Sequence, residues 1–253
     1  MPQSTRSQNL LVLSRERPRT KEQLHKYVKQ VFGFHIPRRA VCPEHQAPFE
    51  VLVELFFEME RRLLVLANRG GGKTRLLSIA HFLKSRFKDR NWIVHVGAIE
   101  LQAKRCYDYV REYAMDNEYL SPAVVSTLMS ITRFTNQSRI EVLPGTLNSL
   151  SGPHPPIACA DEVEWWPWIN LQQFIGMPMS TPEILAQTIY ASTRQKVFGT
   201  MQRLLDDASK MRLTTHAWCI FETLKPPCPY SSPECPMWRD CEGRRFFRVN
   251  YAI

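Results

Sequence analysis

The sequence lacks any long uninterrupted run of apolar residues. No window approaches the roughly 18 to 20 apolar residues that a membrane-spanning helix needs. The N-terminal residues, MPQSTRSQNL, contain no apolar core of the kind found in a secretory signal. Internal repeats and low-complexity tracts are missing as well. These absences predict a soluble intracellular protein that does not act in a membrane.

The sequence also lacks the paired cysteines of a secreted disulfide framework. Its seven cysteines are an odd number. Four of them stand singly in the chain: Cys42, Cys106, Cys159 and Cys219. Reduced thiols in a reducing compartment explain these residues better than disulfides do.

The composition is that of a folded domain with a basic N-terminal stretch. Of the 253 residues, 44% are hydrophobic, which is enough for one large α/β domain with a small appendage. The net charge of +9 is concentrated in residues 1–40, where nine Lys or Arg residues face only Glu16 and Glu22. This stretch is either an arm that attracts nucleic acid phosphates or a solvated, partly mobile terminus.

Strand and helix signals alternate through most of the chain. Short apolar runs predict strands at 63–67, 92–98, 138–144, 156–162 and 188–194. Helical spacing predicts helices at 21–34, 49–62, 73–88 and 99–115. The last of these helices should bury one face, formed by Ile99, Ala103, Cys106, Val110 and Tyr113. The economical architecture is an α/β fold with a mostly parallel sheet flanked by helices.

The loop NRGGGKT, residues 68–74, lies between a predicted strand and a predicted helix. Gly70, Gly71 and Gly72 let the backbone N–H groups approach a phosphate closely. Lys73 can then reach the β- and γ-phosphates, and the Thr74 hydroxyl can bind Mg²⁺. Ala67 stands where the P-loop (Walker A) pattern has its first glycine, although it removes no phosphate ligand. A purely structural glycine turn is the alternative.

The segment PPIACADEVE places Asp161 and Glu162 at the end of another predicted strand. As the Walker B pair, Asp161 would hold Mg²⁺, usually through water, and Glu162 would accept a proton from the attacking water. A lone Asp after an apolar strand is common in ordinary α/β proteins. The adjacent pair, together with the G-K-T loop, instead predicts an ATP-hydrolysing P-loop enzyme.

Five segments, in order, resemble the large terminase subunit of tailed bacteriophages, the ATPase motor that packages DNA into procapsids. They are CPEHQAPF, NRGGGKT, VGAIELQAKR, GTLNSLSGPHPPIACADEVE and YASTR, and they cover roughly residues 42–194. The resemblance implies a RecA-like (ASCE) P-loop fold. It places Gln46 against the adenine, Arg69 beside the γ-phosphate as a catalytic residue with Lys73 and Glu162, and Ser192 and Thr193 as γ-phosphate sensors.

The resemblance also implies the partners and the setting. They are double-stranded DNA, the portal protein, the small terminase subunit and a homo-oligomeric ring, all in the host cytoplasm. In a ring, Arg133 or Arg139 of a neighbouring subunit could replace Arg69 at the γ-phosphate. Many family members carry an arginine where this chain has LNSLS, so a role for that arginine is not transferred.

Two other functions stay open. A helicase shares the loop, the Asp-Glu pair and a helix with a Gln-Ala pair, here Gln102 and Ala103, but it needs a second RecA-like lobe. A nucleotide-binding switch or scaffold without turnover would have no need of Glu162 as a base. Steady ATP hydrolysis separates the enzyme from the switch.

The resemblance divides the chain into three parts. Residues 1–60 form a basic helical extension with the adenine segment, 61–194 the ATPase core, and 195–253 a helix and a cysteine-containing linker. We expect the chain to be a piece that would continue into a nuclease domain, so no nuclease residue is assigned. Three tryptophans, Trp165, Trp166 and Trp168, should pack in the core or an interface rather than stack on bases.

The segment CPYSSPECPMWRDC carries three further cysteines, Cys228, Cys235 and Cys241. They could hold a loop around Zn²⁺, with Cys219 or His216 as the fourth ligand. Reduced cysteines packed in a loop and a disulfide are the alternatives.

Overall fold

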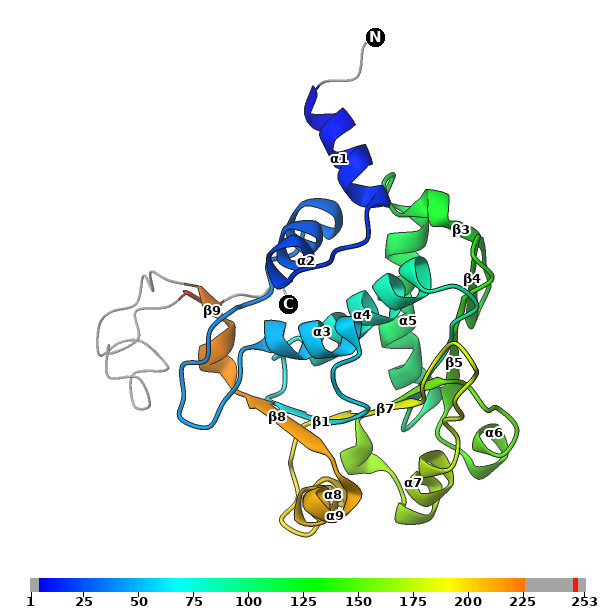
Figure 1. Ribbon diagram of the computed structural model, residues 1–253. Coiled ribbons are helices and arrows are strands. Elements are labelled where there is room, and N and C mark those ends of the chain that lie inside the picture. The colour runs from blue at the N-terminus through cyan, green and yellow to red at the C-terminus, as the bar shows by residue number, and fades with distance from the viewer. Residues whose placement is uncertain (1–4, 226–247, 250–253) are drawn as a thin grey trace.

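The computed structural model describes residues 5–225 and 248–249, and an eight-stranded sheet forms its centre (Figure 1). The strand order is β3-β4-β5-β2-β6-β7-β1-β8. Every neighbouring pair from β5 to β8 in that order is parallel, whereas β3 and β4 add an antiparallel edge. The strands are β1 Arg62–Ala67, β2 Trp92–Gly97, β3 Val124–Thr127, β4 Ile131–Phe134, β5 Arg139–Pro144, β6 Ile157–Asp161, β7 Gln187–Ser192 and β8 Thr214–Trp218.

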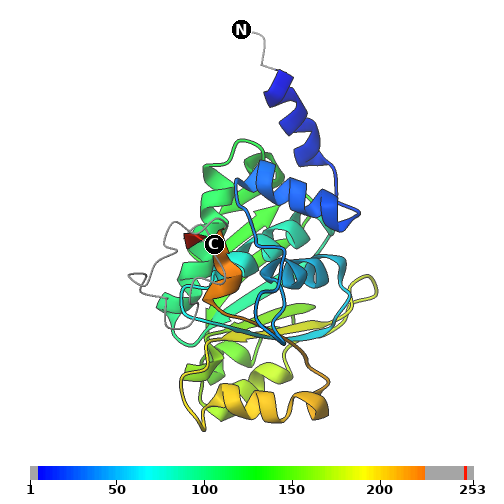
Figure 2. The same ribbon diagram turned by 90° about the vertical axis from the view of Figure 1, so that its left-hand side faces the viewer.

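Helices cover both faces of this sheet (Figure 2). One face carries α3 Pro48–Phe57, α4 Lys73–Phe87 and α5 Glu100–Met115. The other carries α6 Leu147–Leu150, α7 Trp168–Ile175, α8 Thr200–Asp206 and α9 Ala208–Met211. At the N-terminus, α1 Thr5–Arg15 projects outward, and α2 Lys21–Tyr27 continues as a π-helix over Val28–Phe32. The α/β fold with a mostly parallel sheet is therefore confirmed.

The central strands are buried on both faces, which is why they read as continuous apolar runs. In β1, Leu63 and Val65 pack toward α3 and α4, whereas Leu64 packs toward α8. In β6, Cys159 and Ala160 point to opposite layers in the same way. Burying each of the larger aliphatic side chains contributes about 1.5–3 kcal/mol, so two core layers hold the sheet rigid.

Several sequence expectations need correction at the ends of elements. The helix expected over 49–62 ends at Phe57, because Glu58 takes a left-handed conformation (φ 58°) and Arg62 already begins β1. Ile99, expected in the buried face of α5, is 56% exposed because it precedes the first helical turn. The other four residues of that face are buried.

The last described elements follow β8. A short 3₁₀ helix spans Ile220–Thr223, and β9 Leu224–Lys225 pairs with β10 Arg248–Val249. The three cysteines Cys228, Cys235 and Cys241 lie outside the described residues. In the part of the chain that the structure describes, no helix is both long and apolar enough to cross a membrane.

Candidate nucleotide-binding site

The glycine loop connects β1 to α4 at the carboxyl edge of the sheet. Gly70 and Gly72 both have φ 76°, a left-handed backbone that other residues adopt only at a cost. A Cβ on Gly71 would lie 2.4 Å from Asn68 Oδ1 and 3.0 Å from the Asn68 carbonyl oxygen, so a larger residue would require Asn68 to shift. The indole Nε1 of Trp218, at the end of β8, donates to the Gly71 carbonyl at 2.9 Å and supports the loop from behind.

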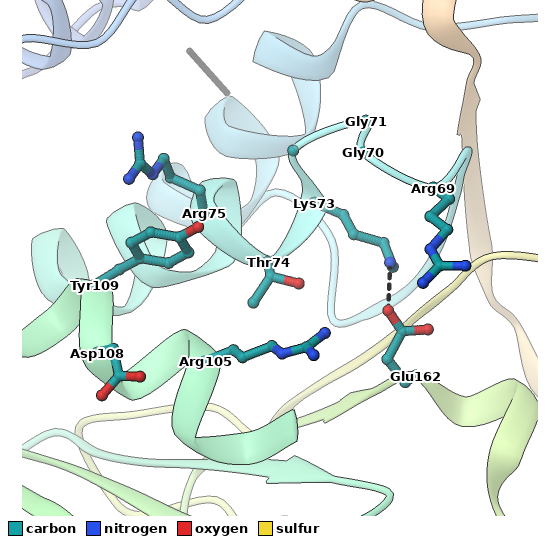
Figure 3. A pocket seen from close by; sticks show the side chains of 11 residues that line it. Arg69, Gly70, Gly71, Lys73, Thr74, Arg75, Arg105, Asp108, Tyr109 and Glu162 are labelled. Carbon is teal, nitrogen blue, oxygen red and sulfur yellow. Dashed lines mark hydrogen bonds and ion pairs between the residues drawn. The ribbon is translucent and has the colours of Figure 1, made fainter. Parts of the chain in front are cut away.

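A pocket of about 560 Å³ opens in front of this loop (Figure 3). It lies at the N-terminus of α4, a helix of 15 residues, where backbone N–H groups and the helix dipole favour an anion. The lining residues are Arg69, Gly70, Gly71, Gly72, Lys73, Thr74, Arg75, Arg105, Asp108, Tyr109 and Glu162. The loop residues expected to bind phosphate are thus together in one concave site.

Lys73 and Glu162 meet inside the pocket. The Lys73 Nζ donates to Glu162 Oε1 at 2.7 Å, although the residues are 89 positions apart (Figure 3). Glu162 itself has φ 53°, a left-handed conformation directly after β6. Strained backbone of this kind costs of order 1–3 kcal/mol and clusters at functional sites. In this conformation the Glu162 carboxylate faces the glycine loop.

Thr74 and Asp161 form the second contact between the loop and β6. The Thr74 hydroxyl donates to Asp161 Oδ2 at 3.0 Å, and Asp161 is only 1% exposed. Behind Asp161 lies His95, whose Nε2 is 3.8 Å from Oδ2. Burial lowers the pKa of His95, and the Asp161 charge opposes that shift. A hydroxyl and a carboxylate are oxygen ligands of the type that Mg²⁺ prefers, so these two residues fit a magnesium site.

Arg105 is a pocket residue that the sequence reasoning missed. It extends from α5 toward Glu162, opposite Arg69 (Figure 3). Its position could have been inferred, because α5 follows β2 and β2 adjoins β6. Helices that follow parallel strands begin at the same carboxyl edge, where ligands of open α/β sheets bind.

Besides the buried Asp161, three expected site residues lie outside this lining. Gln46 pairs with β8: its side-chain Oε1 accepts from the Ala217 N–H, and its own N–H donates to the Ala217 carbonyl, both at 2.9 Å. Ser192 is buried at the end of β7, where its hydroxyl accepts from the Glu164 N–H at 3.1 Å. The Thr193 hydroxyl accepts from Gln195. Their roles at the nucleotide stay predictions.

The two alternative arginines are also distant from the pocket lining. Arg139 begins β5, at the opposite edge of the sheet, and its guanidinium lies 4.0 Å from the centroid of Trp92. Arg133 is exposed on β4. Neither residue lines the pocket.

The tryptophan cluster is divided between core and surface. Trp166 is buried, and its Nε1 donates to the Asp161 carbonyl at 3.1 Å. Trp165 is half exposed with Lys196 over its ring, and Trp168 stacks under Arg203 at 3.6 Å. The prediction that these tryptophans pack in the core is therefore confirmed for Trp166.

Glu164 was missed by the sequence reasoning, although it lies two residues after Glu162. It is buried, and its carboxylate accepts from the backbone N–H groups of Gln195, Lys196 and Met201. A Cβ on Gly199 would collide with the same carboxylate. Glu164 therefore organises the loop that connects β7 to α8.

No protein-family model matches the sequence, and no curated protein matches it. Solved structures do match its fold. The large terminase of bacteriophage HK97 is 17% identical, with a TM-score of 0.55 over 88% of this chain and 54% of that one. The fold is that of a phage large terminase. A variant ATPase domain from the large terminase of Thermus phage P74-26 is 12% identical and has a TM-score of 0.51 over 78% of this chain and 86% of that domain.

A third large terminase, from a thermophilic bacteriophage and in complex with ATP-γ-S, matches with a TM-score of 0.54 and 11% identity. The alignment covers 75% of this chain and 48% of that one. The chain thus spans about half the length of these large terminases, 54% for HK97 and 44% for another crystal form of the thermophilic phage protein. At these identities the likeness concerns the fold.

Proposed function

We propose that this chain is a Mg²⁺-dependent ATPase that drives translocation of double-stranded viral DNA during packaging. The observation that carries the proposal is the pairing of Lys73 with Glu162 in the pocket and of Thr74 with the buried Asp161 next to it, on the fold of a large terminase. Each pair joins a loop residue to the end of β6, where phosphate binding and water activation must meet.

The loop would hold the triphosphate. Backbone N–H groups of the loop and of the first turn of α4 would face its phosphate oxygens. These oxygens would compete with Glu162 for the Lys73 ammonium group. Once Lys73 turns to the phosphates, the Glu162 carboxylate is free to accept a proton from the attacking water.

Magnesium fits the same site. Thr74 Oγ1 and Asp161 would hold the ion, Asp161 through water, and the ion would neutralise charge on the β- and γ-phosphate oxygens. Buried Asp161 supplies the negative charge for this cation within 3.0 Å of the hydroxyl ligand.

Two arginines would act on the charge that develops at the γ-phosphate. Arg69 and Arg105 reach the pocket from the loop and from α5, one on each side of Glu162 (Figure 3). A planar guanidinium can donate two parallel hydrogen bonds to phosphate oxygens. Both are candidates for a transition-state contact within one subunit.

The likeness to large terminases supports the motor function that we propose. Double-stranded DNA, the portal protein, the small terminase subunit and a ring of identical subunits are the proposed partners, in the host cytoplasm. Ser192 and Glu164 would link the nucleotide site to the loop before α8, because the Glu164 N–H donates to Ser192 while its carboxylate holds that loop.

Magnesium-dependent ATP turnover tests the enzymatic part of the proposal. Steady-state phosphate release should require Mg²⁺ and should fall in Asp161→Asn, which keeps the shape of the side chain but removes its charge. Tight ATP binding without turnover in the unaltered chain would instead indicate a nucleotide-binding switch. Strand separation driven by ATP would favour the helicase alternative.

A further inference from the structure

Four potential metal ligands meet on the far side of β8 from the nucleotide pocket. Cys42 and His45 belong to the segment CPEH, and Cys219 and Glu222 belong to CIFE, about 180 residues later. One ligand atom from each of the four lies within 4.8 Å of all the others. The nucleotide site uses none of them.

Two of the six distances between these atoms are close to the edges of a tetrahedron around a zinc ion. Around Zn²⁺, with Zn–S near 2.3 Å, two sulfurs are about 3.8 Å apart, and a nitrogen and an oxygen are about 3.3 Å apart. Here Cys42 Sγ and Cys219 Sγ are 3.5 Å apart, and His45 Nδ1 is 3.1 Å from Glu222 Oε2. A disulfide would need the two sulfurs at about 2.0 Å.

The backbone holds the cluster in place. Glu222 is 1% exposed, and its carboxylate accepts from the backbone N–H groups of Val41 at 3.1 Å, Cys42 at 2.7 Å and Cys219 at 2.8 Å. These bonds fix the two cysteine backbones against each other, although they belong to distant segments. Oε1 accepts two of these bonds, whereas Oε2 accepts only the Cys219 bond from the backbone and keeps a second lone pair, on the side of His45, for a cation.

We infer that Cys42, His45 and Cys219 bind Zn²⁺, with Glu222 as the fourth ligand. Two thiolates and an imidazole favour zinc over Mg²⁺ or Ca²⁺, which take oxygen ligands. Four protein ligands close the site, so the ion is structural rather than catalytic. CPEH separates a cysteine and a histidine by two residues, a short separation like that of the C-x₂₋₄-C pairs of zinc sites. The sequence alone did not reveal this site because its other half is remote.

The position of the site shows what zinc would stabilise. Gln46, next to His45, is paired with Ala217 in β8 by two hydrogen bonds. Trp218, next to Cys219, donates to Gly71 of the glycine loop. The ion would therefore fasten the segment before α3 to the end of β8 and, through Trp218, support the phosphate loop. His216, considered earlier as a ligand, instead contacts Glu54 at 2.7 Å.

Metal content of the full chain tests this inference independently of ATP hydrolysis. Protein purified without chelator should contain about one zinc per chain, and Cys42→Ser and His45→Ala should each lose most of it. The matched control is the triple variant Cys228→Ser, Cys235→Ser, Cys241→Ser, which should keep its zinc. Loss of zinc in the triple variant with retention in Cys42→Ser would overturn the assignment.

Cobalt substitution provides a second readout for variants that fold poorly. Co²⁺ added to the metal-free chain should give the intense visible absorption of a tetrahedral thiolate site, and Cys219→Ser should reduce its thiolate-to-metal band. Glu222→Gln should weaken Co²⁺ binding about 10-fold or more if the carboxylate is a ligand. A chain with no zinc and no cobalt spectrum contradicts the inference, whether its thiols are reduced or Cys42 and Cys219 form a disulfide.

Discussion

Glu162 combines a strained backbone with a charged contact to Lys73. We expect Glu162→Gln to bind ATP with nearly unchanged affinity, because the amide keeps the size of the side chain and leaves the phosphate ligands in place. Turnover should fall by at least about 10²-fold, the usual cost of removing a general base. Nucleotide binding and steady-state hydrolysis measured on the same preparation check this. Hydrolysis at the wild-type rate would show that another group activates the water.

Arg69 and Arg105 should be substituted one at a time to show which of them acts on the γ-phosphate. Arg69→Ala and Arg105→Ala should lower kcat more than they weaken ATP binding, because their charges would act on the transition state. The loss for the residue that contacts the γ-phosphate could reach the 10³ to 10⁵-fold seen for arginine fingers. Arg133→Ala removes the exposed side chain of β4 and tests the alternative donor. A large loss in Arg133→Ala, with none in Arg69→Ala and Arg105→Ala, would move the contact to a neighbouring subunit.

The residues of the site differ in how far the sequence could predict them. Lys73, Thr74, Asp161 and Glu162 follow from local patterns, since each chemical role depends on its place directly after a strand. Arg105 has no such pattern, because its place in the pocket depends on which strands are neighbours.

At the scale of secondary-structure elements, a buried lysine of α4 connects this helix to α3 and β7. Lys84 of α4 donates to the Leu55 carbonyl, Glu58 and Gln187. Burial lowers the pKa of Lys84 to about 8, although Glu58 opposes the shift. Between about pH 8 and the ordinary lysine value of 10.5, the unfolded chain therefore holds more protons than the folded chain.

Stability should consequently rise with pH in this window by at most about 1.4 kcal/mol per pH unit from this residue. Below pH 8 the cost of the buried charge is fully present, and it is relieved as the pH increases. Lys84→Met keeps most of the packing and removes the titration. Urea unfolding from pH 7 to 10 should show the wild-type free energy of unfolding rising relative to the variant, and parallel curves would contradict the role given to Lys84.

The hydrogen bond from Trp218 of β8 to the glycine loop should contribute to both stability and ATP affinity. Trp218→Phe removes the donor to the Gly71 carbonyl while keeping an aromatic ring in the core. We expect a stability loss of about 0.5–1.5 kcal/mol and weaker ATP binding, because the loop loses a support behind the phosphates. Isothermal titration and urea unfolding of the variant measure both quantities. Unchanged ATP affinity would show that the loop holds its shape without Trp218.

Elements at the centre of the sheet were predictable and those at its edges were not. Four of the five strands expected from apolar runs, β1, β2, β6 and β7, are buried on both faces over most of their length, so their sequences carry a strong signal. The fifth, β5, alternates buried with half-exposed residues. The other three, β3, β4 and β8, lie at the ends of the strand order, where half-exposed residues such as Ser126 and Thr214 interrupt the apolar pattern. Edge strands depend on pairing with distant partners, which local sequence does not encode.

At the scale of the whole molecule, the sequence brings distant segments to one edge of one sheet. The loop after β1 and the end of β6 form the pocket, although β7 lies between these strands. Ser192, at the end of β7, is thus positioned between the phosphate loop and Asp161 in strand order. The division into residues 1–60, 61–194 and 195–253 stays a prediction.

The steady-state rate of ATP hydrolysis with and without double-stranded DNA tests the central claim most directly. The account predicts Mg²⁺-dependent turnover that double-stranded DNA increases, with a response that weakens as salt screens the phosphates. Lys73→Ala, which would remove the proposed phosphate contact, provides the inactive control. ATP binding without turnover, or turnover that responds to single-stranded but not to double-stranded DNA, would contradict the assignment of a double-stranded DNA motor.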